Sequence, residues 1–195
     1  MRVHLILIWA FALVAFPLVS QAQVPVFEIT PVESTISFDV EGSVAIKGAF
    51  HKWDSTFICT STDASHCVLE IKIRADSVDT GSGMKDGKLK SKDFFDVKEN
   101  PYITFKSTHS VQKSPDTFEV DGDFTIRGVT KPEKLNLTLV GKGTGSGTVT
   151  GTMAFDRKDY GMNSGIPLVK IANRVEVTVN LKVKRVSGPP LVFSQ

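Results

Sequence analysis

Apolar and polar side chains alternate along most of this chain, and a repeat of two residues is typical of β-strands with one dry face. Leu69, Ile71 and Ile73 alternate with charged residues, and residues 175–183 form the clearest run of this kind. Turn-forming residues separate such runs about every 8 to 12 residues. No amphipathic stretch is long enough for the helix of a βαβ crossover. The pattern predicts an all-β, mainly antiparallel fold of about eight to ten strands, either a barrel or a sandwich.

One segment, residues 83–107, interrupts the strand pattern. Residues 85–92 are polar and tolerate a helix, with Leu89 as the only aliphatic side chain, and they run into Phe94 and Phe95. Pro101 disfavours helix at the residue before it, and an extended run follows. We expect a short helical lid segment that packs Leu89, Phe94 and Phe95 over one end of the β-structure.

The first 22 residues have the composition of a secretory signal peptide. A basic start precedes an apolar run from Leu5 to Val19, and residues 20–22 place small side chains at the alternate positions that signal peptidase prefers. A transmembrane anchor is the alternative, but it needs about 18 to 20 apolar residues, and Pro17 interrupts this shorter run. We predict a cleaved signal peptide (1–22) and one exported domain (23–195) that is not an integral membrane protein.

The net charge argues against a nucleic-acid partner, and the two cysteines suggest a disulfide. The formal net charge is only +2, and no basic run is interleaved with aromatic residues, which argues against nucleic acid. Cys59 and Cys67 are expected to pair in an oxidising compartment. Their bond would clip a hairpin and contribute about 2 to 3 kcal/mol. A metal site with His66 is the alternative, although the spacing is not typical of zinc.

No set of catalytic residues is evident. His51, His66 and His109 lie in unrelated turns and strand ends, and neither an H-E-x-x-H nor a G-x-S-x-G motif occurs. The glycine-rich run 141–147 lacks the ending of a phosphate loop and fits a hairpin loop. We predict a protein that is not an enzyme and requires no cofactor or metal. A secreted hydrolase, which would need a convergent polar triad, is the alternative.

The dry faces are purely hydrophobic in character, with 13 phenylalanines against two tyrosines and two tryptophans. A lipid-lined interior needs such faces, and so does a solid core, because a barrel of about eight strands can be filled by side chains or hold one small ligand. Composition leaves both interpretations open.

The proline-bearing tail from Ser187 to Gln195 is expected to fray.

Several motifs, in order, cover nearly the whole predicted domain. They are STISFDV (34–40), IKGAF (46–50), ADSVDTG (75–81), LKSKDFFDV (89–97), NPYITF (100–105), FTIRGVTKP (124–132) and DRKDYGMN (156–163). Together they resemble the YceI-like family. The resemblance implies an antiparallel lipocalin-like β-barrel, exported to the bacterial periplasm, that binds a polyisoprenoid such as an isoprenoid quinone or a polyprenyl diphosphate. The Cys59/Cys67 pair departs from the family pattern and either braces a hairpin or reshapes the pocket rim.

The inward faces supply the lining candidates, although ordinary core packing explains any single one equally well. Lys85, Lys88, Arg157 and Lys158 are loop cations that could meet a phosphate head at the mouth, with solvated surface charge as the alternative. The expected partner is a long-chain isoprenoid lipid, and a homodimer is one candidate assembly. The competing hypothesis is an interaction module with a filled core. The predicted apolar lining comprises Ile36, Phe38, Val44, Ile46, Phe50, Leu69, Ile71, Ile73, Leu89, Phe94, Phe95, Ile103, Phe105, Phe118, Val120, Phe124, Leu135, Leu137, Val177 and Val179.

Overall fold

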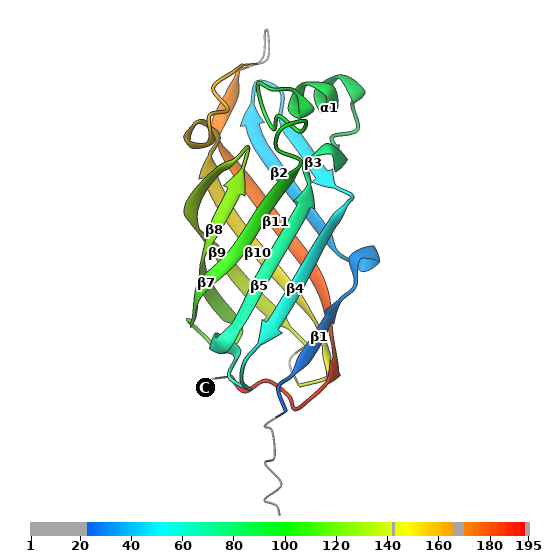
Figure 1. Ribbon diagram of the computed structural model, residues 1–195, viewed down its shortest axis with the longest axis vertical. Helices are drawn as coiled ribbons and strands as arrows, with labels where there is room; N and C mark the ends of the chain where they lie inside the picture. Colours follow the sequence, from blue (N-terminus) through cyan, green and yellow to red (C-terminus); the bar gives the residue numbers. More distant parts are fainter. Residues whose placement is uncertain (1–22, 142, 166–169, 194–195) are drawn as a thin grey trace, which may run out of the picture.

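A computed structural model describes residues 23–141, 143–165 and 170–193, in which the strands wrap into a barrel (Figure 1). The predicted signal peptide lies outside these residues. Within them, the one α-helix is α1 (Gly83–Lys90), and short 3-10 turns are η1 (Pro31–Glu33), η2 (Ala64–His66), η3 (Ala75–Ser77) and η4 (Arg157–Tyr160). The strands are β1 (Val26–Ile29), β2 (Thr35–Gly42), β3 (Ile46–Phe50), β4 (Trp53–Cys59), β5 (Cys67–Arg74), β6 (Val78–Asp79), β7 (Tyr102–Gln112), β8 (Thr117–Ile126), β9 (Val129–Val140), β10 (Ser146–Asp156) and β11 (Ile171–Ser187).

These segments close into an antiparallel barrel of eight strand positions, which confirms the predicted fold class. β11 pairs with β10 on one side and with both β2 and β1 on the other, so β1 and β2 together fill one position of the ring. Ser34 bridges the break between them, since its hydroxyl donates to Thr30 O at 2.7 Å and accepts from Lys182 N at 2.8 Å. β3 and β4 share the next position, because β3 pairs with β2 and β4 pairs with β1.

The inward faces of the strands form one continuous hydrophobic core. In β5 the predicted alternation holds, with Leu69, Ile71 and Ile73 all buried. Val44 is the exception, because the prediction that it faces inward is wrong. Its side chain is 52% exposed. The preceding Ser43 donates its backbone N–H to Lys170 O at 2.9 Å, so the turn extends further than expected and β3 begins only at Ile46.

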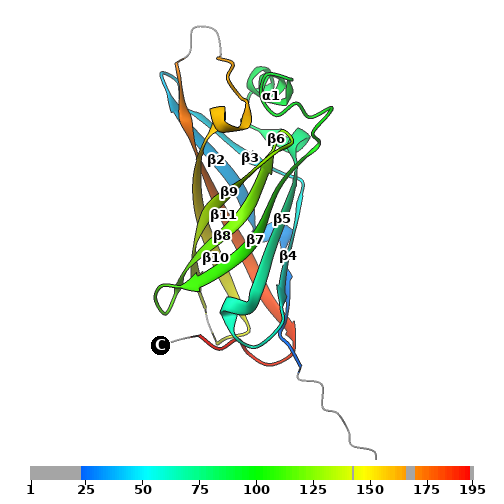
Figure 2. The same cartoon turned by 60° about the vertical axis from the view of Figure 1, so that its left-hand side comes forward.

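The two ends of the barrel are covered by different segments (Figure 2). At one end lies what we call the lid, which consists of α1, residues 91–99, η4 and residues 161–164. The predicted helical lid segment is confirmed, and Leu89, Phe94 and Phe95 are all buried beneath it. At the other end runs the C-terminal segment, residues 188–193 (red in Figure 1). The sequence predicted that the tail from Ser187 to Gln195 frays, but within residues 188–193 the Val192 backbone is hydrogen-bonded to the loop after β4. The last two residues of that prediction, 194–195, lie outside the described residues.

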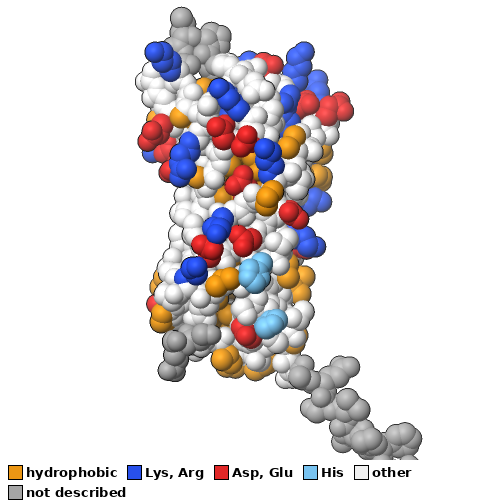
Figure 3. Space-filling view, turned by 90° about the vertical axis from the view of Figure 1, so that its left-hand side faces the viewer, with side chains coloured by type: hydrophobic (Ala, Val, Ile, Leu, Met, Phe, Trp, Pro, Cys, Tyr) orange, Lys and Arg blue, Asp and Glu red, His pale blue; other side chains and the backbone are white. Residues whose placement is uncertain are grey.

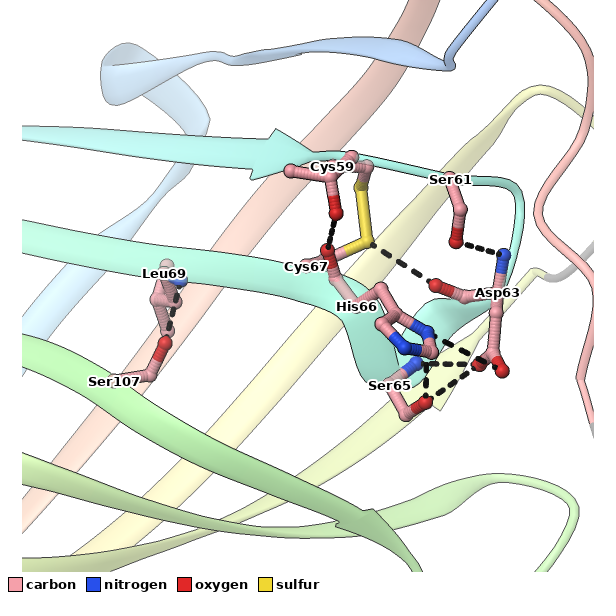
Figure 4. Close-up of a disulfide and its surroundings, with 9 residues drawn as sticks. Cys59, Ser61, Asp63, Ser65, His66, Cys67, Leu69 and Ser107 are labelled. Atoms are coloured by element: carbon pink, nitrogen blue, oxygen red, sulfur yellow. Dashed lines mark hydrogen bonds and ion pairs between the residues drawn. A yellow bond between two sulfur atoms is a disulfide. The ribbon is translucent and has the colours of Figure 1, made fainter. Parts of the chain in front are cut away.

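That loop is clipped by the predicted disulfide, which the structure confirms (Figure 4). Cys59 ends β4, Cys67 begins β5, and the two residues are register partners. Both sulfur atoms are used in this bond, so the alternative of a thiolate metal site is wrong. Between them, the Asp63 carboxylate accepts hydrogen bonds from Ser65 N at 2.8 Å and Ser65 Oγ at 2.7 Å, which fixes the η2 turn.

Gly122, in the middle of β8, makes room for an aromatic ring inside the barrel. A Cβ atom at this position would lie 2.4 Å from Phe105 Cζ and 2.7 Å from Lys106 O. The register of β7 against β8 shifts between Ser107 and His109, directly beside this glycine. The extra residue lies on β7, so the strand that faces Gly122 carries a β-bulge.

We predict that Gly122→Ala lowers the free energy of unfolding by about 1 to 3 kcal/mol, because the new methyl group overpacks against Phe105 and backbone. Urea unfolding followed by circular dichroism measures this. The control is Gly87→Ala in α1, where nothing lies within 4 Å of the new Cβ. Alanine should raise stability there by about 0.5 to 1 kcal/mol. Equal effects of the two substitutions would contradict this account of Gly122.

Candidate functional site

An apolar cavity beneath the lid, here called the upper cavity, is the candidate functional site. Its volume is about 70 Å³, and Arg157 is the only charged residue among the described residues that line it. The lid contributes Leu89, Phe94 and Phe95, and the barrel strands contribute most of the remainder. The full lining is Ile36, Phe38, Val40, Ile46, Phe50, Ile73, Leu89, Phe94, Phe95, Ile103, Phe124, Ile126, Phe155, Arg157, Met162, Ile171, Val175 and Val177.

The predicted lining residues divide between this cavity and a second one of about 40 Å³, here called the intermediate cavity. The structure brings Leu69, Phe118, Val120 and Leu137 together around the intermediate cavity. Ile71, Phe105, Leu135 and Val179 are buried but border neither space. The predicted residues that border the upper cavity are Ile36, Phe38, Ile46, Phe50, Ile73, Leu89, Phe94, Phe95, Ile103, Phe124 and Val177.

A layer of side chains separates these two cavities. On β5, Ile71 lies between Ile73 of the upper cavity and Leu69 of the intermediate cavity, and on β7 Phe105 holds the corresponding place. On β11, Val179 lies between Val177 of the upper cavity and Leu181 of the intermediate cavity. Phe105 sits in this layer because Gly122 offers it no opposing side chain. The interior is therefore a tube of apolar side chains with a packed constriction in its middle.

Several upper-cavity residues were missed from the sequence. Val40 and Val175 share inward faces with predicted residues of their strands, and Phe155 alternates with the buried Met153 on β10, so the alternation of two could have found all three. Met162 could not be found in this way, because it follows the η4 turn and belongs to no periodic run. Its side chain is only 2% exposed.

Arg127 holds the two halves of the lid together, a role that its sequence gave no sign of. Arg127 and Gly128 both have positive φ, 55° and 71°, in the tight turn between β8 and β9. This turn projects the guanidinium outward, where it donates to Lys92 O at 2.7 Å and to Gly161 O. One side chain thereby ties residues 91–99 to the η4 side of the lid.

Arg157 was predicted as a loop cation that could meet a phosphate head at the mouth, and the alternative of a solvated surface charge is wrong. Its side chain is buried, and the guanidinium donates to Ala172 O at 3.1 Å, Ser164 O at 2.9 Å and Met162 O. Burial lowers the pKa of this guanidinium from its ordinary value, but arginine stays charged. Arg157 is thus a buried cation at the wall of an apolar cavity, held by backbone carbonyls of the lid and of β11.

The three other predicted cations lie on the lid itself. Lys85 and Lys88 belong to α1, and the exposed Lys158 belongs to η4. Lys88 Nζ lies 2.6 Å from Asp93 Oδ2, and this contact lowers the pKa of the Asp93 carboxyl. The structure therefore places a set of lysines at the same end of the barrel as Arg157.

Tyr160 anchors η4 to the barrel. It is fully buried, its ring packs edge-on against Phe124 and Phe155, and its hydroxyl donates to Glu133 Oε1 at 2.7 Å. Burial, followed by the hydrogen bond to the Glu133 carboxylate, raises the pKa of the Tyr160 phenol well above its ordinary value of 10.0. The neutral phenol is therefore the form that this site stabilises.

The described surface shows no sign of a metal centre or a membrane-spanning helix. Acidic and basic side chains are intermixed over the face in Figure 3, without a field of one sign. Within residues 23–141, 143–165 and 170–193, no cluster of three or more His, Cys, Asp or Glu side chains is placed to hold a metal ion. No helix in these ranges is long and apolar enough to cross a bilayer.

Comparison with known proteins supplies the family. The model of the YceI-like domain matches residues 27–183. A UPF0312 protein of Pectobacterium atrosepticum is 38% identical over 96 residues, about half of each chain. A UPF0312 protein of Vibrio cholerae is 28% identical over 169 residues, which cover 83% of this chain and 89% of that protein.

Two solved structures share the fold. BcnA of Burkholderia cenocepacia superposes with a TM-score of 0.72 at 23% identity, covering 80% of this chain and 99% of that one. A polyisoprenoid binding domain from Saccharophagus degradans, implicated in plant cell wall breakdown, superposes with a TM-score of 0.65 at 14% identity and covers 83% of this chain and 99% of that one.

Tyr160 gives a pH-dependent prediction. Because its pKa is higher in the folded than in the unfolded chain, stability is fully present below pH 10 and falls as the pH rises above that value. In a Tyr102→Phe variant, ultraviolet phenolate absorbance should appear only together with the loss of circular dichroism. Reversible titration of Tyr160 near pH 10 in a protein that remains folded would contradict its placement.

Proposed function

Because the chain belongs to the YceI-like family, we propose that it is an exported, periplasmic protein that holds a polyisoprenoid lipid inside its barrel and performs no chemistry on it. The observation that carries this proposal is the apolar upper cavity, which lies under a lid and has Arg157 as the one charged residue in the described part of its wall. The ligand class is an isoprenoid quinone or a polyprenyl diphosphate. The Saccharophagus degradans neighbour, a polyisoprenoid binding domain, supports this class.

Transfer energetics explain why such a barrel suffices without catalysis. Each methylene removed from water contributes about 0.8 kcal/mol, so a long isoprenoid chain gains strongly from an apolar tube. The interior offers it aliphatic and aromatic side chains. At the lid end, Arg157 in the cavity wall could contact the polar head of the ligand, and Lys85, Lys88 and Lys158 lie nearby. We therefore orient the ligand with its head toward the lid and its chain toward the C-terminal segment.

The cavity volume sets a requirement on binding. Sites for drug-sized ligands occupy about 300 to 1,000 Å³, whereas the upper cavity measures about 70 Å³. A long chain therefore enters only if the lid opens and the layer of Ile71, Phe105 and Val179 gives way. The same small volume favours the second candidate function, an interaction module with a filled core.

Extraction decides between these two functions. The protein is purified after expression from the full-length sequence, extracted with organic solvent, and compared by mass spectrometry with a matched control protein. We expect an isoprenoid in stoichiometric amount. If the extract stays empty even after incubation with ubiquinone and with polyprenyl diphosphate, the filled-core function holds instead.

A cavity-filling substitution tests where the ligand lies. Val177 is half-buried in the wall of the upper cavity, so Val177→Phe should occupy that space and weaken quinone binding about tenfold or more, a loss of about 1.4 kcal/mol. Quenching of Trp53 fluorescence by added quinone measures the affinity.

The matched control is Val44→Phe, which adds the same group to an exposed turn outside the barrel. It should bind quinone as the unmodified protein does. If Val177→Phe also binds with unchanged affinity while remaining folded, the ligand does not occupy the upper cavity.

A further inference from the structure

The end of the barrel opposite the lid holds a third apolar space, here called the basal cavity. It measures about 100 Å³ and is bordered by Phe27, Phe57 and Leu139 of the barrel wall and by the glycine-rich hairpin loop. Arg185 is the only charged residue among its described lining, and its guanidinium donates to Gly188 O. The other described residues of this lining carry no charge and are mainly apolar, so the space suits a hydrocarbon.

The C-terminal segment closes this space. After β11 the chain turns at Gly188, whose φ is +78°, and crosses beneath the barrel (Figure 1). Leu191 and Phe193 turn into the basal cavity, and the ring of Phe193 packs edge-on against Phe118 at 6.2 Å. The side chain of Val192, between them, is 62% exposed. The segment therefore has alternating inward and outward side chains without belonging to the barrel ladder.

Leu191 is the partition between two cavities. It borders the basal cavity and the intermediate cavity, which also share Phe57, Leu139, Val149 and Val183. The other four belong to barrel strands and Leu191 belongs to the C-terminal segment, so withdrawal of this segment would remove Leu191 from between the two spaces. The side chains of the C-terminal segment thus occupy the place where the far end of a long chain would emerge.

Two backbone hydrogen bonds join the C-terminal segment to the loop after β4, and the segment belongs to no ladder of the barrel. Val192 N donates to Thr62 O at 2.7 Å, and Ala64 N donates to Val192 O at 3.3 Å. Both partners belong to the loop that the Cys59–Cys67 disulfide clips (Figure 4). Segments held by few hydrogen bonds open locally at lower free energy than the strands they cover.

We propose that the C-terminal segment is a gate at a second, basal mouth of the barrel, and that the hydrocarbon end of a long isoprenoid displaces Leu191 and Phe193 from it. This inference rests on the proposed function for its ligand. In the closed state, the C-terminal segment is hydrogen-bonded to the loop that the disulfide clips. The gate makes the barrel sensitive to chain length, since a short chain that ends in the upper cavity never reaches the C-terminal segment.

The test compares two quinones with the same head, one with eight isoprene units and one with two. Leu191→Ala/Phe193→Ala removes the side chains that compete with the ligand, so the long quinone should bind about tenfold more tightly, because the gate no longer has to open first. The short quinone should bind equally to the variant and to the unmodified protein. Val192→Ala is the matched control, because it shortens an exposed side chain of the same segment.

Hydrogen exchange of the Val192 amide gives a second readout on the unmodified protein. The Val192 amide should lose protection from exchange when the long quinone is added and keep that protection when the short quinone is added. Unchanged protection with the bound long quinone, or equal gains for both quinones in the double variant, would overturn the gate while leaving the proposed function intact. Failure of every variant to bind either quinone would overturn both.

Discussion

The barrel depends on β11, because this strand closes the sheet upon itself. Its 17 residues pair along one side with β10 and along the other with β2 and then β1. Without those pairings, β10 and β2 would each expose a free edge. The inward residues of β11 also run through every level of the interior. Val177 borders the upper cavity, Val179 lies in the packed layer, and Val183 borders the intermediate and basal cavities.

A closed barrel can exchange its contents only at its two ends, and the chain builds those ends in different ways. At the lid, the guanidinium groups of Arg127 and Arg157 donate to backbone carbonyls of residues 92, 161 and 164, which belong to no strand, and Arg157 also donates to Ala172 O of β11. At the base, the closure is an apolar segment docked on a disulfide-clipped loop. The lid end thus carries charged side chains, with Arg157 in the cavity wall, whereas the segment that closes the basal end is apolar. This difference matches a ligand with a polar head and a hydrocarbon chain.

The two-residue repeat of apolar and polar side chains predicted most of the barrel, because every second residue of a regular strand faces the buried side. Leu69, Ile71 and Ile73 could be assigned from this rule alone. The rule fails where the backbone leaves the ladder. Val44 is exposed because the turn before it bonds to Lys170, and that contact spans more of the chain than any local pattern can indicate.

The site residues that sequence reasoning misplaced share a physical cause. Arg157 is buried because backbone carbonyls satisfy its donors, and carbonyls leave no signature in a sequence. Leu191 and Phe193 lie in a short tail rich in proline, where the periodicity of a strand is lost. The partners of this tail, Thr62 for the Val192 backbone and Phe118 for the Phe193 ring, come from distant parts of the chain. Side chains whose position depends on such contacts can be assigned only from the fold.

The central claim, that the interior of the barrel holds an isoprenoid chain, is tested most directly by photo-crosslinking. A prenyl quinone analogue that carries a photoreactive group along its chain would be irradiated with the protein, and the modified residues would be identified by mass spectrometry. The account predicts adducts on inward residues such as Phe38, Phe50 and Ile73. Adducts confined to exposed residues such as Val44 or Ile58 would contradict it.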